Sequence, residues 1–233
     1  MSREHRLERF AHLPALEPRL DTLPDAQRRL WPLLGDIPDD FVLCGGTALA
    51  LHLGHRSSVD FDFFSARPFV PTDLLATLRW LGPVTVIDAR PDTLSFSTAD
   101  AVRLSFFGAM EIQVVAEQGL AHENGLVIAS VFDLAGSKAK ALLDRSEWKD
   151  YVDLVTLLRD GHRLVDIIGY ATTIFEPLFA FPAAVFLRSI VFFEDGTAPD
   201  VPEEMQRELE AAVERAWGET IPVVEPYASR ITP

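Results

Sequence analysis

One short run limits the fold more than any other feature of this chain of 233 residues. From Val59 to Phe63 apolar and acidic residues alternate, reading Val59-Asp60-Phe61-Asp62-Phe63. Successive side chains of a β-strand point to opposite faces, so the alternation predicts a strand that buries both phenylalanines and presents both aspartates on one side. We therefore expect a sheet with one buried face and one polar face.

The residues before that strand predict another strand that turns directly into a helix. Apolar residues 41–44 run into Gly45-Gly46, and the helical stretch 47–53 ends at Gly54, a typical C-terminal stop. Free backbone amides at such a turn can hold phosphate oxygens, and Thr47 could add a hydroxyl. The sequence fits neither the Walker pattern nor GxGxxG. A tight turn that binds nothing is the alternative.

The order of the predicted elements divides the chain in two, because strands dominate the first half and only helical patterns follow. The expected helices are 4–13, 24–34, 47–53 and 71–80, then 131–143, 148–158, 164–175 and 202–217, and the expected strands are 41–44, 59–64, 84–88, 93–98, 102–107 and 111–115. We expect an α/β fold, with a mixed sheet and flanking helices followed by a C-terminal helical bundle. The expected domains are 1–125 and 126–233, the second completing the active cleft.

Composition places the chain among globular proteins. Hydrophobic residues make up 48%, and the single cysteine, Cys44, excludes both a disulfide framework and a cysteine-rich zinc site. The charged N-terminus and the lack of a long apolar run predict a cytoplasmic protein without membrane contact. A net charge of −14 repels polyanions, so any nucleic-acid contact must be a local patch.

Two neighbouring features together suit nucleotidyl transfer. Carboxylates at i and i+2 of a strand project side by side and suit a cation such as Mg²⁺, which makes Asp60 and Asp62 candidate metal ligands. A phosphate-holding turn beside them is what the reaction needs: metal ions bridge the triphosphate, the α-phosphorus is attacked in line and pyrophosphate leaves. Carboxylates that only face water are the alternative.

The lysines gather in one stretch. Of 21 basic residues only Lys138, Lys140 and Lys149 are lysines, which suggests a need for a compact ammonium there. Lys138 could neutralise the β- and γ-phosphates. Asp150, on the next expected helix, could orient a lysine, assist the acceptor hydroxyl or cap the cleft. An ion-pair network joining the two helices is the alternative, and Lys140 lies on another helix face.

Residues 45–64 resemble the signature of the nucleotidyltransferase superfamily, a glycine pair followed by an alternating DhD strand. Their sequence pattern, GGTALAL…GHR.S.DFDFF, is similar to that of the AbiEii/AbiGii-type abortive-infection toxin family. A second block, residues 138–154, is similar to that family's motif K..A…R…KDY.DL.

The resemblance implies an enzyme, a metal-dependent nucleotidyltransferase that moves a nucleotide from an NTP to an acceptor with Mg²⁺ as cofactor. It implies the toxin of a toxin–antitoxin or phage-defence pair, with tRNA or another RNA as acceptor and a cognate antitoxin protein as partner. Arg56 resembles the arginine of the family's HR and could reach a phosphate or form a salt bridge at the helix end. The implied nucleotide-binding residues are Gly45, Gly46, Thr47, Arg56 and Lys138, and the implied catalytic residues are Asp60, Asp62, Lys138 and Asp150.

The chain departs from the wider superfamily at one point. A third carboxylate often stands on a later strand, whereas residues 102–107 contain none, and Asp88, Glu111 and Glu117 are the nearest candidates. Either two aspartates and the distal Asp150 suffice, or metal binding is weakened. Two other functions therefore stay open: a nucleotidyltransferase acting on a cationic small molecule, as aminoglycoside enzymes do, which would suit the negative charge, and a nucleotide- or partner-binding protein with degenerate catalysis.

Overall fold

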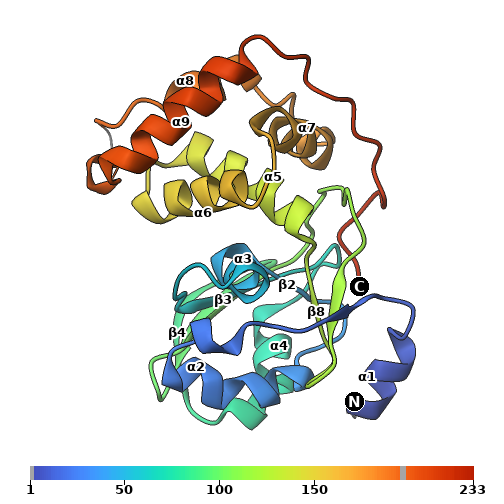
Figure 1. Cartoon of the computed structure of the whole chain (residues 1–233). Coiled ribbons are helices and arrows are strands. Elements are labelled where there is room, and N and C mark those ends of the chain that lie inside the picture. The colour runs from blue at the N-terminus through green and yellow to red at the C-terminus, as the bar shows by residue number, and fades with distance from the viewer. Residues whose placement is uncertain (1–2, 195–197) are drawn as a thin grey trace. The chain divides into compact units, whose positions relative to one another are not determined.

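The computed structural model describes residues 3–194 and 198–233. The chain forms two compact units, drawn in Figure 1. The sheet unit comprises Met1–Ile112, Glu117–Ser130 and Ser229–Pro233, and the helical unit comprises Gln113–Ala116 and Val131–Ala228. The main division therefore falls after Ser130, five residues beyond the expected boundary at 125, because the last strand still belongs to the sheet.

Within the described residues, the sheet unit contains one sheet of eight strands in the order β1-β7-β8-β2-β3-β6-β5-β4. The strands are β1 (Ala15–Leu16), β2 (Val42–Cys44), β3 (Asp60–Phe64), β4 (Val84–Arg90), β5 (Thr93–Thr98), β6 (Arg103–Phe107), β7 (Gly119–Ala121) and β8 (Leu126–Ile128). The pairs β1–β7, β2–β8 and β3–β6 are parallel and the others antiparallel. The predicted α/β fold with a mixed sheet followed by helices is confirmed.

The central strand β3 has the two faces that its sequence predicts. Phe61 and Phe63 are fully buried, and the ring of Phe63 stacks on that of Phe106 at 5.0 Å. Asp60 and Asp62 lie half-buried on the opposite face. Each buried phenylalanine contributes about 1.5–3 kcal/mol relative to an exposed one, so the apolar face fixes the strand's orientation and with it the direction of the carboxylates.

Short helices flank this sheet (Figure 1). They are α1 (Arg3–Arg9), α2 (Asp25–Leu30), α3 (Gly45–Leu53) and α4 (Pro71–Thr77), with 3-10 turns at Leu20–Thr22, Trp31–Asp36 and Arg79–Leu81. The helix predicted over 24–34 passes into a 3-10 turn at Trp31, where Pro32 lacks the N–H of a regular helix. Helix α3 ends at Gly54 with φ of 69°, as predicted.

The strand predicted over residues 111–115 is wrong. Gln113 N donates to Ile174 O, Val114 pairs with Ala228 in an isolated bridge, and Val115 N donates to Oδ1 of Asp133. Three successive residues thus bond to three separate segments of the helical unit. The buried side chains of Ile112 and Val114 produce the alternation of this stretch, but the backbone of residues 113–115 bonds to the helical unit and not to the sheet.

The helical unit contains α5 (Val131–Asp144), α6 (Trp148–Arg159), α7 (Leu164–Phe175), α8 (Ala183–Ser189), a 3-10 turn at Ala198–Asp200 and α9 (Glu203–Ala216). Helices α5 and α7 pack closely because Gly136 has no side chain: a Cβ there would lie 2.6 Å from Cδ1 of Ile174 and 2.9 Å from the amide nitrogen of Ala171. No helix in the described part of the chain has the length and apolarity to cross a membrane.

Candidate active site

The glycine turn lies directly against one of the two β3 aspartates. Gly45, the first residue of α3, has φ of +73°, a conformation that favours glycine. A Cβ at this position would lie 2.6 Å from Oδ2 of Asp62, closer than atoms can approach. Gly45 therefore serves both the backbone turn and the space that the Asp62 carboxylate occupies.

Arg56 covers the second glycine of the turn. A Cβ at Gly46 would lie 2.6 Å from Nη2 of Arg56, and Nη1 of Arg56 donates to Ser57 O at 3.0 Å. The guanidinium is thus held beside the first turn of α3, whose backbone N–H groups lack partners within the helix. A cation and free amides together suit an anionic group such as phosphate.

Thr47 faces the protein interior. Its side chain is 1% exposed, and its hydroxyl donates to Asp60 O and lies 2.8 Å from Oγ of Ser58. These contacts tie the first turn of α3 to the start of β3. In this structure Thr47 positions the turn against the aspartates, and its hydroxyl is engaged there rather than turned outward to a phosphate.

His52 links the C-terminal turn of α3 to a neighbouring segment of the chain. Its Nε2 donates to Ala129 O at 2.9 Å, so the helix is attached to the chain just beyond β8. Burial lowers the pKa of His52, which keeps the ring neutral near neutral pH and suited to this single donated bond. Residues at both ends of α3 thus hold the glycine turn in place.

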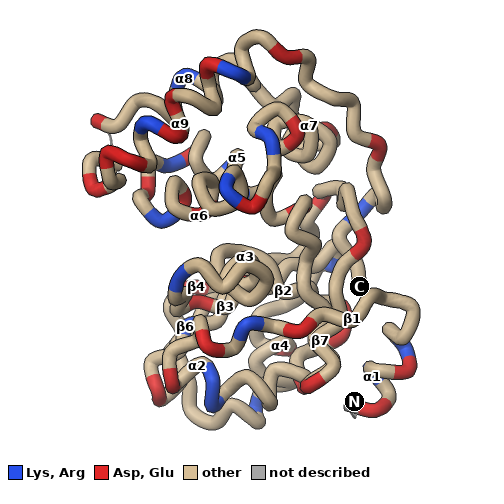
Figure 2. Tube along the Cα trace, in the orientation of Figure 1, with Lys and Arg blue, Asp and Glu red and all other residues tan. Residues whose placement is uncertain are grey.

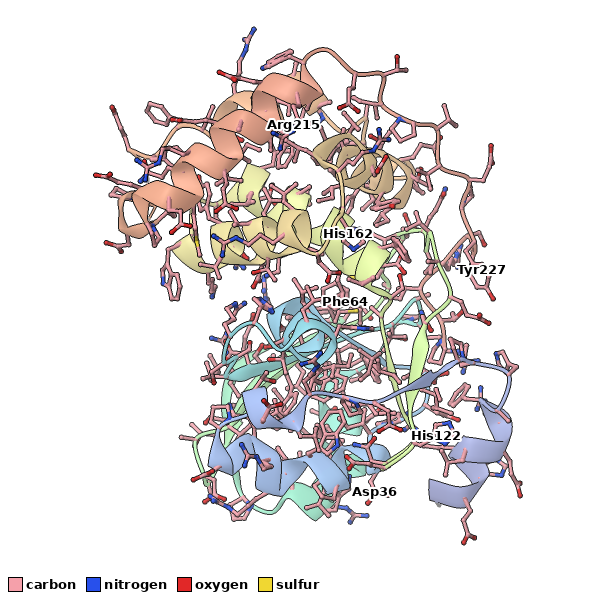
Figure 3. All side chains as sticks on the ribbon, viewed as in Figure 1. Asp36, Phe64, His122, His162, Arg215 and Tyr227 are labelled. Carbon is pink, nitrogen blue, oxygen red and sulfur yellow. The ribbon has the colours of Figure 1, made fainter. Side chains whose placement is uncertain are left out.

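Strand β6 supplies the neighbours of both aspartates. Arg103 pairs in register with Asp60, and Ser105 pairs with Asp62. Among the residues that the structure describes, neither the Asp60 carboxylate nor the Arg103 guanidinium has a hydrogen bond or an ion pair. Both charged groups are therefore available to a ligand. Figure 3 shows the side chains of the sheet unit, and its label Phe64 marks the last residue of β3.

Among the described residues, no third carboxylate is aligned with Asp60 or Asp62 on a neighbouring strand. Asp88 lies on β4, three strands away from β3, where it pairs with Arg90 at 2.6 Å. No cluster of three or more His, Cys, Asp or Glu side chains suited to a metal occurs among residues 3–194 and 198–233. The donor set beside the glycine turn is two carboxylates.

Two carboxylates fit a magnesium ion that arrives with its substrate. Mg²⁺ keeps several waters and is commonly bound by one or two carboxylates together with substrate phosphates, rather than by an all-protein cage. Asp60 and Asp62 share one face of β3, and the lack of a side chain at Gly45 leaves the Asp62 carboxylate its place beside the turn. These are the residues that could hold the ion.

Lys138 lies inside the helical unit, between two aspartates of α6. Its Nζ lies 2.8 Å from Oδ1 of Asp150 and 2.6 Å from Oδ2 of Asp153, and both aspartate side chains are fully buried. Nε of Arg145 donates to Oδ2 of Asp150 at 2.9 Å. An ion-pair network between the two helices, one of the arrangements that the sequence left open, is therefore present.

The other two lysines are surface residues with local partners. Lys140 pairs with Asp144 one helical turn away, and its Nζ lies 5.3 Å from the ring centre of Phe179. Lys149 pairs with Glu147 at 2.9 Å. Only Lys138 of the three is buried, so the clustering of lysines in the sequence does not correspond to one shared site.

Arg103 is the site residue that sequence reasoning missed. The sequence predicts a strand over 102–107 but not its pairing partner, and the parallel pairing of β3 with β6 brings Arg103 beside Asp60. The available signal was the alternation Arg103-Leu104-Ser105-Phe106, which places the arginine and the serine on one face.

Comparison with known proteins finds one family model and one curated relative. The model of the family described as "Nucleotidyl transferase AbiEii toxin, Type IV TA system" matches residues 34–228. The uncharacterized protein aq_aa25 of Aquifex aeolicus strain VF5 is 31% identical over 177 residues, which cover 75% of this chain and 81% of that protein.

Two solved structures also align with the chain. One from H. pylori, whose description names a nucleotidyltransferase, covers 81% of this chain and 92% of its own at 19% identity and a TM-score of 0.47. The other is MenT4, a nucleotidyltransferase toxin from Mycobacterium tuberculosis H37Rv, which covers 92% of this chain and 99% of its own at 16% identity and a TM-score of 0.37.

Proposed function

Since this chain belongs to the AbiEii nucleotidyltransferase toxin family and is a nucleotidyltransferase, we propose a specific reaction for it. It transfers a nucleotide from an NTP to an RNA such as tRNA, with Mg²⁺ as cofactor. The observation that carries the proposal is the placement of Asp62 against Gly45, at the start of a helix whose second residue is covered by Arg56. Carboxylates for a cation and donors for phosphates thus stand side by side.

Different residues of the site would bind the metal ion and the phosphates. Asp60 and Asp62 would hold Mg²⁺, which when bound supplies positive charge to the phosphate oxygens. Arg56 and the amides at the start of α3 would bind the triphosphate of the NTP. The acceptor hydroxyl oxygen forms a bond to the α-phosphorus as the bond from that phosphorus to the β-phosphate oxygen breaks. Pyrophosphate leaves with that electron pair, and the hydroxyl proton passes to solvent.

Lys138 and Asp150 have a structural role in this proposal, within the helical unit. Their direct ion pair, together with Asp153 and Arg145, links α5 to α6. Among the roles that the sequence left open for Asp150, the geometry supports the orientation of a lysine.

The acceptor and the partner are proposed from the family. The sheet unit carries 12 basic and 17 acidic residues and the helical unit 9 and 18, and Figure 2 shows both signs along both units. The sheet unit, which holds Asp60, is thus the less acidic of the two, and an RNA would meet local arginines there rather than a basic surface. A cognate antitoxin protein is the proposed partner in the cell.

Transfer of label to RNA tests the proposal. The purified protein is incubated with total RNA and each of the four [α-³²P]NTPs, with Mg²⁺ or with EDTA, and with [γ-³²P]NTPs as control. We expect label in an RNase-sensitive product from one or more α-labelled NTPs, none from the γ-labelled NTPs and none with EDTA. Label that appears only on an added aminoglycoside, or no transfer at all, would contradict the RNA assignment.

A further inference from the structure

Arg103 and Asp60 form an unusual pair of neighbours. They are aligned in register on the parallel strands β3 and β6, and their apolar neighbours in sequence, Phe61 and Leu104, are aligned and fully buried on the opposite face. Opposite charges at aligned positions normally attract and stabilise a sheet. Within the described part of the chain these two form no ion pair, and Arg103 is exposed. The arginine therefore contributes little to folding.

The position of Arg103 is the position at which a further metal ligand would stand. On the two strands beside β3, the side chains aligned with the aspartates are Arg103 and Ser105 on β6 and Cys44 on β2, and none of them is a carboxylate. A guanidinium repels cations, and a neutral serine hydroxyl is a weak ligand compared with a carboxylate. Strand β6 thus adds a positive charge where a second divalent ion would require negative charge.

From this we infer that the site binds one divalent ion per NTP and that the Arg103 guanidinium takes the place of a second ion by binding the triphosphate. The inference rests on the proposed function, since it assumes that Asp60 and Asp62 hold the ion. The charges of Asp60, Asp62, Arg103 and of Arg56, whose guanidinium lies beside Gly46, add to zero, which suits one divalent cation accompanied by the phosphates, whereas two ions would bring a charge of +4. The planar fork of an arginine can bind two phosphate oxygens at once.

Counting ions tests the inference without any turnover. The purified protein is dialysed to equilibrium with Mn²⁺ and, in turn, the α,β-methylene analogue of each NTP. Bound Mn²⁺ is then measured per bound nucleotide. We expect one Mn²⁺ per nucleotide for the wild type. Arg103→Ala should keep that ratio but raise the Kd of the analogue about tenfold, as for the loss of one charge-assisted contact. Arg103→Glu should raise the ratio to two.

A control variant and a variant of the metal site distinguish failure of this inference from failure of the proposed function. Arg79→Glu makes the same charge change at an exposed residue of the same unit, and it should leave both the ratio and the Kd unchanged. Two Mn²⁺ per nucleotide in the wild type, or an unchanged Kd in Arg103→Ala, would overturn the inference alone. Undiminished Mn²⁺ binding in Asp62→Ala, or no binding of any analogue, would overturn the proposed function as well.

Discussion

The Asp62 carboxylate occupies the space that a side chain at Gly45 would fill, with 2.6 Å between its Oδ2 and the position of a Cβ on that glycine. This contact joins the two halves of the motif, since a residue at the start of α3 sets the position of a residue on β3. The spacing of glycine turn and aspartates along the chain thus has a physical cause. The turn must be glycine so that the carboxylate can stand against the helix N-terminus.

Gly45→Ala should therefore reduce activity far more than stability. The positive φ makes alanine less favourable than glycine by about 1–2 kcal/mol, and the new methyl group must displace the Asp62 carboxylate. A shift of this size at a reacting centre lowers kcat/KM by about a hundredfold. Nucleotide transfer and urea unfolding, measured on the same preparations, check both effects.

Gly82→Ala is the matched control for that substitution. Gly82 has the same φ of +73° but no heavy atom within 4 Å of its Cβ position, so it shares the backbone strain without any collision. Its activity should stay near that of the wild type. Equal activity of the two alanine variants would show that the contact between Gly45 and Asp62 has no role in the reaction.

Lys138→Met should destabilise the fold strongly. The methionine has a similar shape but leaves the buried carboxylates of Asp150 and Asp153 without their shared cation. Removal of one partner of a buried ion pair typically costs about 3–5 kcal/mol. Lys140→Met removes a pair at the surface and should change the free energy of unfolding by about 1 kcal/mol at most. Equal unfolding midpoints in urea for the two variants would refute the assigned role of Lys138.

His52 should make stability depend on pH. Burial lowers the pKa of His52 in the folded protein, whereas in the unfolded chain it is about 6.5. Below that pH the unfolded chain binds a proton that the folded protein resists, so stability falls as the pH drops from about 6.5 toward the folded pKa, by at most about 1.4 kcal/mol per pH unit.

Substitution isolates this contribution of His52. His52→Gln keeps a donor for Ala129 O but does not titrate, so it should flatten the loss of stability below pH 6.5. His12→Gln, at an exposed residue of the same unit, should leave the loss as it is. The free energy of unfolding at a series of pH values gives the comparison, and an unchanged slope in His52→Gln would rule out the histidine as its source.

Local patterns predicted most elements because their causes are local. The alternation over 59–63 predicted both the strand and the face of its aspartates, since burial of Phe61 and Phe63 allows only one orientation. The helices α5, α6, α7 and α9 lie within about one residue of their predicted bounds, because each has a long apolar face.

Features that depend on residues far apart in the sequence could not be predicted from local patterns. Residues 113–115 look like a strand, but they bond to three separate segments. The proximity of Arg103 to Asp60 depends on the pairing of strands some 40 residues apart in the sequence. For Lys138 and Asp150 the sequence left both a role in the cleft and an ion-pair network open, and the direct pair between them depends on the packing of α5 against α6.

The substitution Asp62→Asn tests the central claim, that the β3 aspartates beside the glycine turn carry out nucleotide transfer. Asparagine keeps the shape of the side chain and removes its charge, so the melting temperature without metal should change little. Pyrophosphate release from NTP in the presence of Mg²⁺ and RNA should fall by about a hundredfold to a thousandfold, the usual effect of removing a preorganised charge from a reacting centre. Release at the wild-type rate by this folded variant would contradict the account.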